Sequence, residues 1–377
     1  MTRNRASSSN NLVVCTDLFT LTGGIQRFNQ VISYTLDLVF QEDGIKSHIV
    51  SLKDSPNRIS SHQVGSLTGV KIYGSEGSKI RFMVSIIKLV FGKKPGLIIL
   101  THINLAPIAL FLRVISRYKK TLLVLHGFEA WDKVNWLSYL GIRCCAGFLS
   151  VSYYTKIKFC ERNNVSQEKV FIINLTTGHE WDGSVVRSEI FPVKHPYLLC
   201  VSRLEPVHAY YKGVDKTIRA IAALARSGRL GGYHLVIVGE GEDQDRLIEL
   251  AESEGITHLV HFTGRISDIE LKSYYAHCDM FVLPSTKEGF GLVYLEAMSF
   301  GKSVIASQEG ASNEIVVDGL TGYLVPDGDI DALAGKISLL IESKDERERL
   351  GKAGQDRYLE NFTFSKFVER LKTALLE

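Results

Sequence analysis

The sequence lacks several patterns that would place it in a defined class. Its six cysteines include no C-x-x-C pair and no regular spacing, so we expect reduced thiols rather than a disulfide framework or a zinc site. No G-x-G-x-x-G fingerprint is present, which argues against a site for NAD. The first eleven residues, MTRNRASSSNN, have no apolar core and therefore do not predict a secretory signal.

A membrane-spanning segment is also not expected. The stretch from Gly96 to Ile115 has about the length of a span, but His102, Asn104 and Arg113 interrupt it. We expect this stretch to form a buried strand, a turn and a helix.

The net charge is only +3, but its distribution is uneven. Residues 1–190 hold 23 Lys and Arg against 13 Asp and Glu, a balance of +10, and the remainder therefore carries −7. Much of the excess of Lys and Arg lies in segments 78–94 and 112–120, where these basic residues lie among apolar ones. They are either amphipathic helices with solvated basic faces or a surface for anionic lipid or an anionic acceptor. Aromatic residues are not interleaved as in nucleic-acid-binding segments, so we expect no nucleic-acid partner.

Strand-like and helical segments alternate along the 377 residues, which is typical of βαβ units and parallel sheets. The strand-like segments are 11–17, 47–52, 70–74, 96–102, 121–127, 147–152 and 170–175, then 196–204, 233–241, 258–264, 280–285, 302–307 and 322–325. This length is too great for one core. We therefore expect two Rossmann-like halves, each with its ligands at the carboxyl ends of the strands.

The polar stretch 178–196 predicts the boundary between the halves. We expect a first domain over 1–185, with a disordered tail over 1–10, and a second domain over 190–360. The last segment, 361–377, predicts a helix that packs back on the first domain.

The segment EGFGLVYLEAM places Glu288 and Glu296 eight residues apart, after a predicted strand. We expect its helix to begin around Phe290 or Gly291, where glycine and the helix N-terminus favour phosphate. The two glutamates would lie about 12 Å apart if the rise were helical throughout, enough to flank a diphosphate. Carboxylates can accept hydrogen bonds from a diol. A helix cap with a solvated glutamate remains an alternative.

Other candidates follow strands in the same way. Arg203 and Lys212 come after the first strand of the second half, and both suit phosphate. Gly23 and Gly24 precede the first long helix, where a tight turn or a close approach to phosphate would need glycine. His126 ends a strand, which makes it a stronger candidate than an ordinary structural histidine.

Taken in order, these motifs resemble one family. The set TGGIQRF, VLHG, VSRL…YKG, VGEGED, FTGRI, EGFGLVYLEAMSFGKSVIAS and EIVVDGLTGYLV is similar to the retaining GT-B glycosyltransferases of family 4, over most of the chain. The resemblance implies an α/β GT-B fold, with two Rossmann-like domains whose parallel sheets face a central cleft.

The resemblance also implies roles for the candidate residues. Glu288 would hold the hydroxyls of the donor sugar, Glu296 the ribose, and His126 the transferred sugar. The diphosphate would be bound by Arg203, Lys212, Gly24 and the backbone N–H groups of Phe290, Gly291 and Leu292. The turn of Gly264, Arg265 and Ile266 would lie beside the nucleotide base.

The implied reaction is front-face transfer with retention, in which the departing phosphate helps to deprotonate the acceptor and no metal or cofactor is required. UDP-glucose is the first expected donor and GDP-mannose the second. The expected acceptor is a carbohydrate or a lipid-diphosphate intermediate of polysaccharide assembly. The expected location is the cytoplasm, with peripheral contact at the membrane through the basic first half.

The sequence departs from the family pattern at two places. The step from Arg203 to Lys212 is nine residues where the family typically has about five, and Thr176-Thr177-Gly178 replaces an Asn-Gly pair. A D-x-D in the segment 327–331 is expected to cap a helix rather than bind metal.

Three other functions remain open. They are a nucleotide-sugar epimerase, an NAD-dependent oxidoreductase and a non-catalytic protein that binds nucleotide sugars. Transfer without an epimerised product would exclude the first, and tight NAD binding would favour the second.

Overall fold

The computed structural model describes residues 10–20, 23–40, 43–61, 69–116, 120–178, 181, 196–206 and 211–376. The chain divides into two compact units. Unit 1 comprises Met1–Leu175 and Phe367–Glu377, and unit 2 comprises Thr176–Lys366. Of the expected tail over 1–10, residues 1–9 lie outside the described residues, whereas Asn10 begins the first strand. The expected domain boundary at 185–190 also lies outside the described residues.

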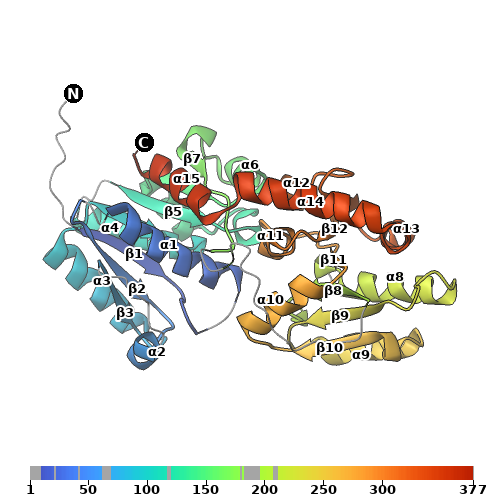
Figure 1. Cartoon of the computed structure of the whole chain (residues 1–377). Coiled ribbons are helices and arrows are strands. Elements are labelled where there is room, and N and C mark those ends of the chain that lie inside the picture. The colour runs from blue at the N-terminus through green and yellow to red at the C-terminus, as the bar shows by residue number, and fades with distance from the viewer. Residues whose placement is uncertain are drawn as a thin grey trace. The chain divides into compact units, whose positions relative to one another are not determined.

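Unit 1 is built on a seven-stranded parallel sheet with the strand order β3-β2-β1-β4-β5-β6-β7 (Figure 1). Its strands are β1 (Asn10–Cys15), β2 (Lys46–Ser51), β3 (Val70–Gly74), β4 (Leu97–Leu100), β5 (Thr121–Leu125), β6 (Gly147–Ser150) and β7 (Val170–Ile172). Its helices are α1 (Gly24–Phe40), α2 (Pro56–Ser61), α3 (Lys79–Lys93), α4 (Ala106–Ser116), α5 (Trp136–Cys144), α6 (Tyr153–Asn163) and most of α15 (Phe364–Leu376).

Unit 2 has a six-stranded parallel sheet with the order β10-β9-β8-β11-β12-β13. Its strands are β8 (Tyr197–Val201), β9 (His234–Val238), β10 (Val260–Gly264), β11 (Met280–Leu283), β12 (Ser303–Ser307) and β13 (Gly322–Val325). Its helices are α8 (Val214–Arg226), α9 (Gln244–Ser253), α10 (Asp268–His277), α11 (Leu292–Ser299), α12 (Ser312–Ile315), α13 (Ile330–Glu342) and α14 (Lys344–Asn361).

The central strands are apolar because helices cover both faces of each sheet. Every residue of β4, β5 and β11 is buried. Such strands appear in a sequence as continuous apolar runs rather than as alternating patterns. All thirteen strand-like segments of the sequence form strands, so the expected pair of Rossmann-like parallel sheets is confirmed.

The described part of the chain also bears on the expected membrane segment and on the cysteines. The stretch from Gly96 to Ile115 forms β4, a short 3-10 turn and α4, and none of the described helices is long and apolar enough to cross a membrane. The six cysteines are free, and five of them are buried.

The last helix, α15, contributes to the core of unit 1 although it ends the chain. Phe367 is 1% exposed and meets the ring of Phe28 on α1 edge-on, with the centroids 6.2 Å apart. Lys120 Nζ, just before β5, donates a hydrogen bond to the carbonyl of Leu375 at 2.8 Å. The first unit is therefore completed by residues that follow the whole of the second.

Candidate functional site

In unit 2, the direction of the strand order changes between β8 and β11. From β8 the chain builds outward through β9 and β10, and it then returns to build β11, β12 and β13 on the other side. All strands are parallel, so their carboxyl ends share one edge. In open α/β sheets such a switch point leaves a crevice where ligands bind.

The loops after β8 and β11 are joined at this edge. The N–H of Thr286 donates to the carbonyl of Tyr211 at 2.7 Å. Gly213 has φ +74°, and a Cβ there would lie 2.6 Å from the carbonyl oxygen of Pro284, so only glycine allows this approach. The join holds Lys212, which lies between Tyr211 and Gly213, beside the loop that carries Glu288.

Lys212 and Glu288 form an ion pair, although 76 residues separate them. The distance from Nζ to Oε2 is 2.7 Å, and the two side chains are 22% and 14% exposed. The backbone of Glu288 is fixed as well, because the N–H of Ala311 donates to its carbonyl at 3.0 Å. The structure thus brings one predicted cation and one predicted acid together in a partly desolvated position.

The helix after Glu288 begins later than the sequence indicated. Gly291 has φ +105° and precedes α11, which begins at Leu292. A Cβ on Gly291 would lie 2.4 Å from the ring of Tyr294, so the turn requires glycine. The expected start at Phe290 or Gly291 is therefore wrong by one or two residues. The condition behind the estimate of about 12 Å between the two glutamates, a helical rise from Glu288 onward, is therefore not met over the first residues of the segment.

Glu296, the second predicted acid, lies in the second turn of α11 and is 5% exposed. Its Oε2 accepts a hydrogen bond of 2.9 Å from the hydroxyl of Tyr275 on α10. Phe290 is 2% exposed, and its ring meets that of Phe362 edge-on at 6.0 Å. Packing therefore anchors both ends of the predicted donor-binding segment.

The other predicted residues of unit 2 lie along the same sheet edge. Arg203 is exposed two residues after β8. Gly264, with φ +67°, ends β10, and the half-buried Ile266 follows it. Arg265 faces Glu240 at 3.5 Å, but both side chains are more than half exposed, so this pair contributes little to stability. Strand β9 separates β10 from β8, and the Gly264 turn is thus set apart from Lys212 and Glu288.

In unit 1 the corresponding switch point lies between β1 and β4. The loop after β1 leads to Gly23 and Gly24, and the carbonyl of Gly23 accepts the N–H of Arg27 in the first turn of α1. Buried Asp54 fixes this loop by accepting hydrogen bonds from the N–H groups of Leu18 at 2.7 Å and Phe19 at 2.9 Å. The sequence analysis missed Asp54, whose only signal was a carboxylate shortly after the second strand.

His126 lies at the carboxyl end of β5 and is 9% exposed. Burial lowers the pKa of its imidazole to about 3, with a smaller effect in the same direction from His102 and an opposing one from the carbonyl of Thr101. Its Nε2 lies 2.7 Å from that carbonyl, which can only accept, so Nε2 carries the proton. His126 is thus neutral, with Nδ1 as an acceptor.

Glu129 is a second residue that the sequence analysis missed. Its Oε1 accepts the N–H of His126 at 3.0 Å and so fixes the loop that follows β5. Burial raises the pKa of this carboxyl group, and hydrogen bonds from the backbone N–H groups of Glu129, His126 and Gly127 oppose that effect. Its signal in the sequence was an acid four residues after the end of β5.

The D-x-D segment caps a helix, as expected. Asp329 precedes α13 and accepts the N–H of Ala332 at 2.8 Å, while Asp327 pairs with Lys216. Across the described ranges, no three His, Cys, Asp or Glu side chains gather in a way that could hold a metal ion.

The comparisons with known proteins agree with this architecture. Residues 185–357 match the family model for glycosyl transferases group 1. The GDP-mannose-dependent alpha-(1-6)-phosphatidylinositol monomannoside mannosyltransferase of Mycolicibacterium smegmatis is 34% identical over 187 residues, which cover 48% of this chain and 47% of that protein. The chain therefore spans about half the length of the curated relatives it matches.

Solved structures resemble the chain over nearly its whole length. The Anabaena protein HepE in complex with UDP has a TM-score of 0.76 at 18% identity and covers 97% of this chain and 99% of its own. Sucrose-phosphate synthase from Thermosynechococcus elongatus has a TM-score of 0.77 at 19% identity, with coverages of 97% and 98%. The chain thus has the Rossmann-like, parallel-sheet units of GT-B glycosyltransferases, and residues 185–357 carry the sequence pattern of glycosyl transferases group 1.

Proposed function

We propose that this protein is a retaining, metal-independent glycosyltransferase of family 4. It would move a hexose from a nucleotide sugar to a carbohydrate or lipid-linked acceptor in polysaccharide or glycolipid synthesis. The ion pair of Lys212 and Glu288 at the switch point of unit 2 carries this proposal. It lies within the region that matches the glycosyl transferases group 1 model.

The proposed chemistry is electrostatic stabilisation of a departing nucleoside diphosphate. Arg203 and Lys212 neutralise its charge, together with the N–H groups of Phe290, Gly291 and Leu292 at the start of α11. Glu288 accepts hydrogen bonds from the hydroxyls of the donor sugar, and its ion pair with Lys212 holds this carboxylate in place. Glu296 holds the ribose, and the turn of Gly264, Arg265 and Ile266 lies by the base.

Unit 1 would contribute His126 and the Gly23–Gly24 turn. Neutral His126 has an acceptor at Nδ1, which suits a sugar hydroxyl better than a phosphate. Gly24 would allow the backbone to approach the phosphates. The departing phosphate accepts the proton of the acceptor hydroxyl, so the proposal needs neither a protein base nor a metal ion.

Two donors compete within this proposal. UDP-glucose is the first, and crystal structures similar to this chain include a HepE complex with that donor. GDP-mannose is the second, because a curated relative that is 34% identical is GDP-mannose-dependent.

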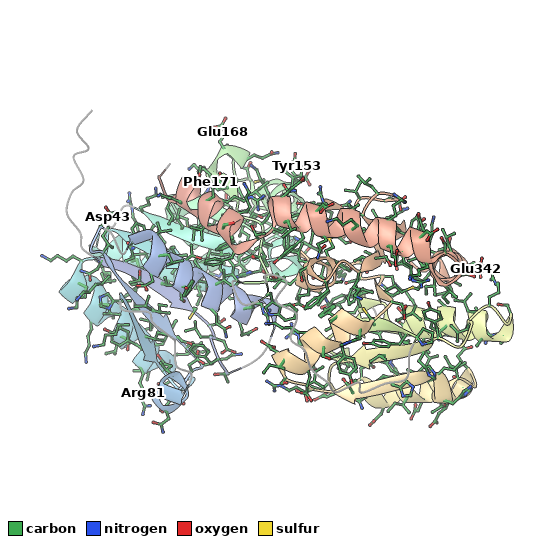
Figure 2. The ribbon with its side chains drawn as sticks, viewed as in Figure 1. Asp43, Arg81, Tyr153, Glu168, Phe171 and Glu342 are labelled. Atoms are coloured by element: carbon green, nitrogen blue, oxygen red, sulfur yellow. The ribbon has the colours of Figure 1, made fainter. Side chains whose placement is uncertain are left out.

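The proposed acceptor lies at an anionic membrane surface that helix α3 contacts. Ile80, Val84 and Phe91 are 79%, 42% and 57% exposed, and their spacing places them on one side of α3. Exposed Arg81, which pairs with Glu76, and exposed Lys88 lie along one edge of this apolar stripe, and Figure 2 shows Arg81 pointing outward. Apolar side chains bordered by cations suit a bilayer with anionic head groups.

Release of nucleoside diphosphate tests the proposed activity. The full chain is incubated with UDP-glucose, GDP-mannose and other nucleotide sugars, without metal or acceptor, and binding of UDP and GDP is measured in parallel. We expect slow hydrolysis of one donor. Glu288→Ala should reduce it at least about a hundredfold in a folded protein, because the fixed carboxylate is lost.

Glu348→Ala serves as the matched control, since Glu348 is an exposed glutamate that also pairs with a lysine, Lys344. This control should leave the rate unchanged. Unchanged turnover in folded Glu288→Ala would overturn the assigned role of Glu288. Failure of both UDP and GDP to bind would overturn the proposed function itself.

A further inference from the structure

A buried tyrosine holds the carboxylate that is proposed to bind ribose. Glu296 is only 5% exposed, and a buried carboxylate is costly unless hydrogen bonds compensate for its lost hydration. The hydroxyl of Tyr275 donates to Glu296 Oε2 at 2.9 Å. It also lies 3.4 Å from the carbonyl of Val293, one turn earlier on α11. Tyr275 therefore ties α10 to the face of α11 that carries Glu296.

The ring of Tyr275 is itself fixed by its neighbours. Tyr275 is 0% exposed. Its ring is parallel to that of Phe300, with centroids 6.1 Å apart and an angle of 6° between the planes. Phe281 lies 5.8 Å away on another side, and Trp181 meets the ring edge-on at 6.0 Å. Because aromatic side chains enclose the ring, the position of the phenol oxygen is defined before any ligand binds.

We propose that Tyr275 is a positioning residue that makes the nucleotide site selective for ribose over deoxyribose. The inference rests on the proposed function, in which Glu296 accepts hydrogen bonds from the ribose. A carboxylate recognises a hydroxyl only when its oxygens have the right direction, and Tyr275 fixes that direction through Oε2. Without the phenol hydroxyl, the Glu296 side chain would lose conformational entropy when the nucleotide binds, and this loss would weaken binding.

Calorimetric binding of UDP, dUDP, GDP and dGDP to the full chain tests this inference. Tyr275→Phe removes the hydroxyl and keeps the ring. We expect it to weaken binding of the ribonucleotide about tenfold and binding of its 2′-deoxy counterpart less than about twofold. The ratio of the two dissociation constants should therefore fall towards one, and Glu296→Gln should lower it as well.

Tyr358→Phe is the matched control. Tyr358 is a buried tyrosine of the same unit, and its hydroxyl lies 2.7 Å from Thr177 Oγ1. Removal of this hydroxyl tests whether the loss of any buried hydroxyl disturbs selectivity. We expect the ratio of the two dissociation constants to stay at the wild-type value. Phe300→Leu, which removes the stacked ring and keeps the Tyr275 hydroxyl, should lower the ratio by a smaller amount.

The outcomes separate this inference from the function on which it rests. If Glu296→Gln loses ribose selectivity while Tyr275→Phe and Phe300→Leu keep it, the role of Tyr275 is wrong and the proposed function stands. If folded Glu296→Gln also keeps the selectivity, the ribose role of Glu296 is wrong, and the inference fails with it. An equal loss of selectivity in Tyr358→Phe would make the effect of Tyr275 a general consequence of destabilisation.

Discussion

At the scale of single residues, burial decides the charge state of His126. The imidazole is enclosed at the end of β5, with the ring of Phe28 edge-on at 4.8 Å and that of His102 at 6.3 Å. Its proton lies on Nε2, directed at the carbonyl of Thr101. A protonated ring would place a charge in this enclosed position, and the folded state therefore resists protonation.

This burial predicts a loss of stability in mild acid. The pKa of His126 is about 3 in the folded protein against an ordinary value of 6.5, so its contribution is complete above pH 6.5 and is lost as the pH falls towards 3. When the pH falls from about 7.5 to about 5, protonation of this histidine in the unfolded state should lower the free energy of unfolding by about 2 kcal/mol. Urea unfolding of His126→Gln should show a correspondingly shallower dependence on pH than the wild-type protein.

His258→Gln provides the control, because it removes a histidine that is exposed. Its pH dependence should match that of the wild-type protein. An unchanged slope in His126→Gln would mean that His126 binds its proton as readily in the folded state as in the unfolded state.

The individual residues differ in how well the sequence could predict them. Lys212 and Glu288 could be predicted as site residues because each follows the end of a strand, and parallel strands bring such ends to one edge of the sheet. Asp54, Glu129 and Tyr275 were not, because their partners are backbone N–H groups or a carboxylate on another element. The position of such a residue in the sequence does not show which group it will contact. The catalytic and binding roles themselves stay predictions.

At the scale of elements, the strands were predictable and the helix starts less so. Strands buried on both faces are apolar runs, and runs of this kind are visible in a sequence. The start of α11 depends instead on the backbone of Gly291. Its φ of +105° is not helical, so the helix can begin only at the next residue, Leu292. A glycine pattern indicates that a turn is present, but it does not give the residue at which the helix begins.

For helix α3, the sequence likewise did not show which residues would be exposed. Its sequence left two interpretations open, a solvated basic face or a surface for anionic lipid. The structure buries Phe82, Ile86 and Leu89, and it leaves Ile80 and Phe91 exposed on a different side. An ordinary amphipathic helix would have polar residues at these exposed positions, which is why we favour the lipid surface.

Vesicle binding tests this helix. We expect the full chain to sediment with vesicles that contain anionic phospholipid, less so at high salt. The double variant Ile80→Ser and Phe91→Ser should bind about tenfold more weakly, because it loses apolar area that the bilayer would cover. Leu359→Ser, which changes a 53% exposed leucine on α14, should bind like the wild-type protein. Equal binding to neutral vesicles would contradict the proposed anionic partner.

At the scale of the whole molecule, the chain builds two parallel sheets, each with one switch point. The alternation of strand and helix predicted both sheets. The sequence analysis expected the last helix to pack on the first domain, but the order of strands within each sheet and the residues that hold α15 depend on contacts between distant parts of the chain. The link from Phe367 to Phe28, and from Phe28 to the ring of His126, is a contact of this kind.

Removal of the Phe367 ring should therefore destabilise unit 1 by about 3–5 kcal/mol, although the residue lies near the end of the chain. Hydrogen exchange followed by mass spectrometry should show faster exchange in β1, α1 and β5 of Phe367→Ala, and unchanged exchange in β8 and β9. Lys372→Ala, at an exposed position of α15, is the matched control. Faster exchange confined to unit 2 would contradict the assignment of α15 to unit 1.

The place of α15 also has a consequence for how the protein is made. A ribosome has completed all of Thr176–Lys366 before it adds Phe367, Leu371 and Ala374, the buried residues of α15. Domains usually fold during synthesis in the order in which they emerge. Although synthesis of unit 1 starts first, unit 2 is the first unit whose sequence is complete. Until α15 has been synthesised, the side of the unit 1 core that α15 covers remains exposed. Chaperones that recognise exposed apolar surface on nascent chains would find it there, on the unit that was synthesised first.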